Sequence, residues 1–225
     1  MNLDLIPLFS GLSEKQHNWL LSRLTERTFY KNQELIESGM PGEFLYIILS
    51  GTVKVFAPQR YGEEVIVAIL GPGDPVGEMS VIDSSGRSAS VIALEETRVL
   101  WINQSSFQEA LQTMPVLAQN LIGILNNRLR TSSGQIQALA ALDVQERVIR
   151  QLLSFAARYG QPAASGKTII PIRLTQSDLA GLVGASRRRV NQAIVALKHS
   201  CWVAVDVDFH ITLLDQAALE REISE

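Results

Sequence analysis

The hydrophobic pattern of the chain changes its period near Phe107, and this change is the feature that most limits the possible folds. Up to that point, short runs of β-branched and aromatic residues alternate with clusters of Gly, Pro and Asp. Many short strands at near-regular spacing predict a β-barrel or β-roll. Residues 12–28 are an exception, because Trp19 and the surrounding leucines are spaced for one apolar face of a helix. The runs expected to be strands are residues 44–48, 52–56, 65–70, 90–93 and 99–102.

From Phe107 to about Leu142 the apolar residues recur at helical spacing, which predicts a long helix with a coiled-coil seam. A second apolar line on this helix, formed by Leu117, Leu121 and Ile124, is expected to pack on the β-domain. A seam of this length needs a partner helix, and the simplest partner is the same helix in a second subunit. The alternative is an ordinary two-faced helix in a monomer. Heptad positions a are Ile122, Leu129 and Ile136, and positions d are Leu125, Ser132 and Leu139.

Composition narrows the class of protein. The chain has 225 residues, of which 46% are hydrophobic, so it can form two cores. It contains neither 18 consecutive apolar residues nor a visible export signal, so we expect a cytoplasmic protein without a membrane span. Cys201 is the single cysteine, which excludes an intrachain disulfide and a cysteine-cluster metal site. The net charge is −3, yet residues 143–200 hold nine Lys and Arg against three acids, which favours a DNA-binding module.

Residues 175–197 have the pattern of a helix-turn-helix. Residues 175–178 form a capping box, an apolar stripe follows, Gly184 suits a turn, and Ser186 is a good N-cap for a second helix. This follows an amphipathic helix predicted over residues 144–160, and residues 202–213 could add a two-stranded wing. A solvated basic helix is the alternative, but it does not explain the caps, the turn and the apolar faces together.

The second helix would lie in a DNA major groove with its first turn on the base edges. Three consecutive arginines cannot all face one way, so we expect one or two to reach bases and the other to reach phosphate. Gln192 could read adenine, whereas Asp206 and Asp208 in the wing would repel phosphate. The candidate DNA-binding residues are Thr175, Gln176, Ser186, Arg187, Arg188, Arg189 and Gln192.

A candidate effector site combines two motifs, Gly77-Glu78-Met79-Ser80 and Arg87-Ser88-Ala89. An arginine among apolar strand residues needs an anion, and its planar fork fits a phosphate. Ser88 adds a hydroxyl donor. The backbone amides after Glu78 can begin a short helix whose N-terminus faces the phosphate, and Glu78 can accept a hydrogen bond from a ribose hydroxyl. An internal ion pair between Arg87 and Glu78 without a ligand is the alternative. We find no metal cluster and no nucleophile–base pair, so we expect a protein that binds a nucleotide and is not an enzyme.

At these motifs the chain resembles the CRP/FNR family of bacterial regulators, over about residues 5–213. The matching stretches are residues 39–51, 71–89, 139–144 and 174–197. The resemblance implies that Gly77 and Glu78 serve the ribose, that Arg87 and Ser88 bind a cyclic phosphate, and that Met79, Ser80 and Ala89 complete the pocket. It also implies that Ser132 and Ser133 reach the base from both subunits. The implied effector is cAMP, with cGMP as the other possibility, and the implied mechanism is allosteric.

Departures from the family pattern affect specificity. Arg188 stands where a glutamate is typical, and Gln192 stands where an arginine is usual, so the operator should differ from the best-known one. Ser132 replaces a threonine, which leaves the choice between adenine and guanine open. Pro75 replaces an aromatic or aliphatic residue and could shift the backbone before Gly77.

These observations predict an α+β chain: residues 1–112 form a cyclic-nucleotide-binding β-roll of jelly-roll type, residues 113–142 a dimerisation helix, and residues 143–225 a winged helix-turn-helix. The expected protein is a homodimeric transcriptional regulator that binds operator DNA under cyclic-nucleotide control, with RNA polymerase as a candidate further partner. One alternative is a regulator of this fold that responds to another ligand or to none. Another is a cyclic-nucleotide-binding regulatory subunit that binds no DNA.

Overall fold

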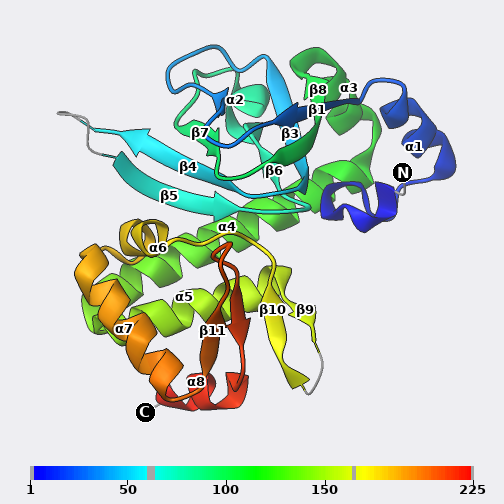
Figure 1. Ribbon diagram of the computed structural model, residues 1–225. Helices are drawn as coiled ribbons and strands as arrows, with labels where there is room; N and C mark the ends of the chain where they lie inside the picture. The colour runs from blue at the N-terminus through cyan, green and yellow to red at the C-terminus, as the bar shows by residue number, and fades with distance from the viewer. Residues whose placement is uncertain (1–2, 60–63, 164–165, 224–225) are drawn as a thin grey trace. The chain divides into compact units, whose positions relative to one another are not determined.

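The computed structural model describes residues 3–59, 64–163 and 166–223. The chain divides into two compact units, Met1–Arg130 and Thr131–Glu225, and helix α4 (Pro115–Ala141) contributes residues to both (Figure 1). In the described ranges, no helix is long and apolar enough to cross a membrane.

In the described part of the first unit, eight strands form two antiparallel four-stranded sheets, in the orders β1-β8-β3-β6 and β2-β7-β4-β5 (Figure 1). Each of the five predicted strands is confirmed. Successive side chains of β3 point to opposite faces of its sheet, so this strand contributes to two cores. Tyr46 and Ile48 enter the core between the two sheets, whereas Leu45 and Ile47 enter a second core that includes the helices. The strands are β1 (Thr25–Phe29), β2 (Glu34–Ile36), β3 (Phe44–Ser50), β4 (Val53–Pro58), β5 (Glu64–Leu70), β6 (Pro75–Val76), β7 (Ser90–Ala93) and β8 (Thr97–Asn103).

The helix predicted over residues 12–28 is too long. Helix α1 covers Glu14–Leu21 and follows two short 3-10 turns, Leu3–Leu5 and Pro7–Phe9. The last residues of the predicted helix instead form β1, which pairs with β8 from Thr25↔Trp101 to Phe29↔Thr97. Backbone pairing with a strand about 70 residues away therefore overrides the helical spacing of the leucines.

The long helical region is also interrupted, at Met114. Helix α3 (Gln104–Thr113) ends there, and α4 begins at Pro115. Met114 has φ −125° and ψ 83°, because the residue before a proline avoids the helical conformation, whereas Pro115 itself suits a first helical position. The predicted packing of Leu117 and Leu121 on the β-domain is confirmed, since both are buried in the core that the helices share with β3.

The second unit contains a helical core and a small sheet of order β11-β12-β10-β9. The amphipathic helix predicted over residues 144–160 is confirmed as α5 (Val144–Tyr159), and its buried Ile149 and Leu152 face inward. The predicted wing is confirmed as the antiparallel pair β11–β12. The remaining elements are α6 (Gln176–Val183), α7 (Arg187–His199), α8 (Gln216–Glu222), β9 (Gln161–Pro162), β10 (Thr168–Ile170), β11 (Val203–Val205) and β12 (Ile211–Leu213).

Candidate functional site

The first candidate site is built around the turn from β6 into helix α2 (Glu78–Asp83). Gly77 connects the two elements with φ +83°, in the left-handed region that favours glycine. A Cβ atom at this position would collide with the Arg87 guanidinium and lie 2.9 Å from Ile36 Cδ1. Only glycine therefore lets the backbone approach the arginine this closely.

The Arg87 side chain is buried, with 7% of its surface exposed. Its Nη1 donates to the Gly77 carbonyl and to Ser80 Oγ, both at 2.7 Å, and Nη2 donates to the Phe44 carbonyl at 2.5 Å. Burial lowers the pKa of Arg87, and the charges of Tyr46 and two glutamates oppose this shift. Each hydrogen-bond partner is a neutral oxygen, so these contacts hold the guanidinium in place without neutralising its charge.

A charged pair of this site joins Glu78 to Arg128 of α4. Glu78 is 5% exposed, and its Oε1 lies 2.8 Å from Arg128 Nη1. Arg128 Nη2 also donates to the Pro75 carbonyl at 2.5 Å, and its buried Nε has no hydrogen-bond partner among the described residues. Two arginines therefore flank the start of α2, and one carboxylate lies between strand β6 and helix α4.

The second candidate site is the pair of helices α6 and α7. The Thr175 side chain accepts a hydrogen bond from the Asp178 amide, and Asp178 bonds back to the Thr175 amide, so the predicted capping box is confirmed. Gly184 takes φ +58° in the turn, and Ser186 caps α7 by accepting from the Arg189 amide. Val190, Ile194 and Leu197 form the buried face of α7. This is the geometry of a helix-turn-helix.

Two family models match the regions that carry these sites. A cyclic nucleotide-binding domain matches residues 26–114, and a Crp-like helix-turn-helix domain matches residues 146–222. A CRP-like cAMP-activated global transcriptional regulator of Mycobacterium tuberculosis is 32% identical over 199 residues, which cover 88% of each chain. The chain belongs to the CRP/FNR family.

Solved structures agree with this assignment at the level of the fold. FixK2 from Bradyrhizobium japonicum aligns with a TM-score of 0.76 and 23% identity, covering 88% of this chain and 96% of its own. The c-di-GMP responsive global regulator CLP of Xanthomonas campestris aligns with a TM-score of 0.68 and 23% identity, covering 90% and 100%. This CRP/FNR-family chain is thus a CRP-like transcription regulator with a cyclic nucleotide-binding domain and a DNA-binding helix-turn-helix. Its curated relatives are transcriptional regulators.

Most of the predicted effector residues of this CRP/FNR member lie together. Gly77, Glu78 and Ser80 surround Arg87 at the start of α2. Met79 and Ser88 are both exposed beside it, with Ser88 Oγ 4.0 Å from Met79 Sδ. The internal Arg87–Glu78 ion pair that the sequence left open is not formed among the described residues, because Glu78 pairs with Arg128 instead. Ala89 follows Ser88 and is half-buried, whereas Ser132 and Ser133 are exposed on α4.

Arg128 contacts the candidate site, and sequence reasoning missed it. It precedes the heptad residue Leu129 and lies four residues before Ser132, so both polar side chains fall on one side of α4. The sequence did contain a signal for Arg128, because this charged residue lies one helical turn before Ser132, the single polar position of the seam. What the sequence could not supply was its partner, since Glu78 is 50 residues away along the chain.

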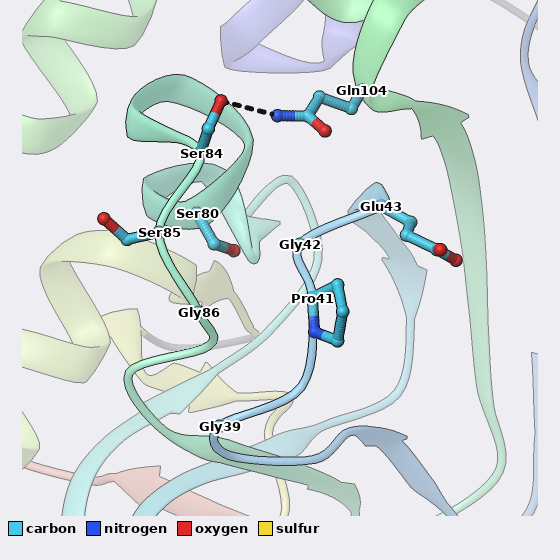
Figure 2. Close-up of a pocket in the computed structure, with 9 residues that line it drawn as sticks. All are labelled: Gly39, Pro41, Gly42, Glu43, Ser80, Ser84, Ser85, Gly86 and Gln104. Carbon is cyan, nitrogen blue, oxygen red and sulfur yellow. Dashed lines mark hydrogen bonds between the residues drawn. The ribbon is translucent and has the colours of Figure 1, made fainter.

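A cavity of about 310 Å³ lies beside α2 (Figure 2). It lies between two loops, one of residues 39–43 and the other of residues 84–86. Of the predicted effector residues, only Ser80 lines it. The cavity is therefore distinct from the exposed surface at Ser88 and is not the predicted nucleotide site.

Most of the predicted DNA-binding side chains are exposed. Arg187, Arg188, Arg189 and Gln192 are all exposed on the first turns of α7. Gln176, at the start of α6, donates from Nε2 to Asn191 Oδ1 of α7 at 2.8 Å. This bond ties the starts of the two helices together. The contacts of these side chains with bases and phosphates stay predictions.

The turn of the wing is ordered by Asp206. Its Oδ1 accepts from the amides of Asp208 at 2.9 Å and His210 at 2.8 Å, and its Oδ2 lies 3.0 Å from His210 Nδ1. Burial raises the pKa of Asp206, but the hydrogen bonds and charge of His210 outweigh this and lower the pKa overall. The carboxylate thus folds the turn and remains negative at the tip of the wing.

Proposed function

We propose that this protein is a homodimer whose binding to operator DNA is controlled by a cyclic nucleotide, with cAMP as the effector and cGMP as the alternative. The nucleotide would bind at Gly77, Glu78, Met79, Ser80, Arg87, Ser88 and Ala89 of the β-roll and at Ser132 and Ser133 of α4. As a regulator of bacterial DNA it would act in the cytoplasm. In this proposal, residues 1–112 sense the ligand, residues 113–142 dimerise and residues 143–225 bind DNA.

Arg87 is the observation that carries the proposal. A guanidinium has five N–H donors, and among the described residues Arg87 uses three of them, all on neutral oxygens. The Nε–H and one Nη2–H are left for a bound anion. Because a buried charge without a counter-charge is costly, a phosphate that takes these two donors would stabilise the site.

Arg128 supports the same assignment from α4. Its Nη1 holds Glu78 where a ribose hydroxyl could donate to the carboxylate, and its buried Nε still lacks an acceptor. A nucleotide beside α2 would supply oxygen atoms to that donor. Because Arg128 belongs to the long helix, ligand binding would change contacts between the β-roll and α4. An effector controls DNA binding in this way only if it binds the DNA-competent state more tightly than the other state.

Calorimetric titration with cAMP and with cGMP tests the proposal. We expect saturable binding near one site per chain, and we expect Arg87→Ala to weaken it by about 100-fold or more, since two charge-assisted hydrogen bonds are lost. Arg98→Ala is the matched control, because Arg98 is an exposed arginine of the same domain that pairs with Glu26 on the outer surface. Unchanged affinity in Arg87→Ala would contradict the assignment.

A regulator of the same fold that responds to another ligand, or to none, is the second candidate. The Arg128–Glu78 pair favours it, because the buried carboxylate is already satisfied without a nucleotide. The structural neighbour CLP is c-di-GMP responsive, so a fold of this kind can serve a different ligand. Absence of binding to both cyclic mononucleotides, with specific DNA binding retained, would favour this candidate.

A further inference from the structure

Helix α2 is too short to hold its own position. It has six residues, and an isolated helix of this length is unstable because the free energy needed for nucleation exceeds the stabilisation from so few hydrogen bonds. Its placement therefore depends on side chains from outside the helix. At its first turn these are Arg128, which binds Glu78, and Arg87, which donates to Ser80.

The last turn of α2 is held by two glutamines of α3. The final carbonyls of any helix lack partners within the helix, and in α2 the buried Val81 carbonyl is one of them. Gln108 Nε2 donates to this carbonyl at 2.9 Å, and Gln104 Nε2 donates to it at 3.3 Å. The two glutamines are four residues apart, so they lie on the same face of α3.

Gln104 also holds the residue at which the chain leaves α2. Ser84 has φ +57°, a left-handed conformation that a non-glycine residue keeps only when its surroundings enforce it. Gln104 Nε2 donates to Ser84 Oγ at 3.1 Å across the edge of the cavity (Figure 2). Ser84 starts the loop that leads to Arg87, so one side chain contacts both the end of α2 and the beginning of this loop.

We propose that Gln104 and Gln108 are positioning residues of the nucleotide site. By fixing the Val81 carbonyl and Ser84, they set the place of α2 and of the loop, and hence the distance between Glu78 and Arg87. They act through these segments and not by contact with the nucleotide. The inference rests on the proposed function, because it assigns the determinants of affinity at the same site.

The chemistry requires a donor at both positions, which suggests the test. Gln→Glu keeps the shape of the side chain but replaces the donor with a carboxylate that repels the Val81 carbonyl. Gln104 is the first residue of α3, where a negative charge stabilises a helix, so Gln104→Glu does not weaken α3 itself. Gln112→Glu is the matched control, since Gln112 is exposed on the same helix. Gln108→Lys restores a donor at the second position.

Binding of cAMP and cGMP would be measured by calorimetry for each variant, with thermal melting alongside. We expect Gln104→Glu and Gln108→Glu each to weaken binding by about tenfold, and the double variant to weaken it further, with melting midpoints close to that of Gln112→Glu. Gln108→Lys should recover most of the affinity. Affinity of the double variant within about twofold of the control would overturn the inference, as would equal losses in Gln108→Lys and Gln108→Glu.

Amide hydrogen exchange separates this inference from the proposed function. If the unaltered protein binds neither nucleotide, the proposed effector is wrong, and the exchange of the α2 amides in the free protein then decides the role of the glutamines. Faster exchange of α2 in Gln108→Glu than in Gln112→Glu supports the positioning role. Equal exchange in the two variants contradicts it.

Discussion

At the scale of single residues, the site depends on how closely the backbone at Gly77 approaches Arg87. The guanidinium reaches the Gly77 carbonyl because no side chain stands between them. The same side chain also reaches Ser80 and Phe44, which belong to α2 and β3. One arginine therefore joins three segments of the β-roll, and its position is sensitive to any atom added at Gly77.

We expect Gly77→Ala to destabilise the protein by about 2–4 kcal/mol, from left-handed strain and from collision with Arg87 and Ile36. Gly39→Ala is the matched control, because Gly39 has φ +84° but an added Cβ there meets nothing within 4 Å. The control should show only the strain, about 1–2 kcal/mol. Urea unfolding measures both values. Equal losses in the two variants would show that Gly77 matters for its conformation alone.

At the scale of elements, α7 begins with three consecutive exposed arginines in its first turn, directly before the buried Val190. Successive residues of a helix differ in direction by about 100°, so Arg187, Arg188 and Arg189 face different parts of a bound duplex. We therefore expect base reading and phosphate binding to be divided among these neighbouring side chains.

We expect Arg187→Ala to weaken specific DNA binding by about 1–3 kcal/mol and to relax the preference at one base position. Lys198→Ala is the control, since Lys198 is exposed at the other end of the same helix. Binding to a pool of operator variants, sequenced before and after selection, measures the preference. An equal loss on all sequences would make Arg187 a phosphate contact instead.

The wing is expected to lose stability in acid through Asp206. A carboxylate whose pKa is lower in the folded state stabilises the fold at pH values above its unfolded pKa of about 3.9, and this stabilisation is lost as the pH falls through the folded pKa. The melting midpoint of Asp206→Asn should therefore lie below that of the unaltered protein at pH 7, and the difference should shrink below about pH 4. Asp208→Asn, in the same turn, is the control. A difference that does not depend on pH would contradict the role of the charge.

At the scale of the whole molecule, α4 carries an apolar line that the single chain leaves uncovered. Ile122, Leu129, Ile136 and Leu139 are between 50% and 68% exposed, although they occupy the heptad positions of the predicted seam. Leu125 differs, because it packs partly against the helical side of the β-domain core. The exposed line is the surface on which we propose that a second copy of the chain binds.

We expect Leu129→Asp to convert the proposed dimer to a monomer, because it places an unpaired charge in the seam and removes apolar burial worth about 2 kcal/mol per subunit. Val67→Asp is the control, since Val67 is a comparably exposed apolar residue on β5 rather than on α4. Sedimentation velocity over a range of concentrations measures the assembly. Dimers of unchanged affinity in Leu129→Asp would place the interface elsewhere.

The features that the sequence alone determined are those whose causes are local. The capping box at Thr175, the turn at Gly184 and the N-cap at Ser186 each involve residues within four positions of one another, so their pattern predicts the helix-turn-helix directly. Strands such as β3 and β5 follow from runs rich in β-branched and aromatic residues between turns. The interruption at Met114 also has a local cause, because Pro115 restricts the residue before it, although the apolar spacing predicted one long helical region.

Tertiary structure decided the features whose causes lie far apart in the chain. Residues 25–28 lie within the stretch predicted to be helical, but they form β1 because β8 offers a row of backbone partners. The sequence predicted Arg87 and Glu78 as site residues, yet it could not show that Glu78 would pair with Arg128 rather than with Arg87. Gln104 and Gln108 carried no signal at all, since an amide side chain gains its role only when folding places an unsatisfied carbonyl within reach. The energy of a buried charge or carbonyl depends on which atoms surround it, and the packing of the whole domain chooses those atoms.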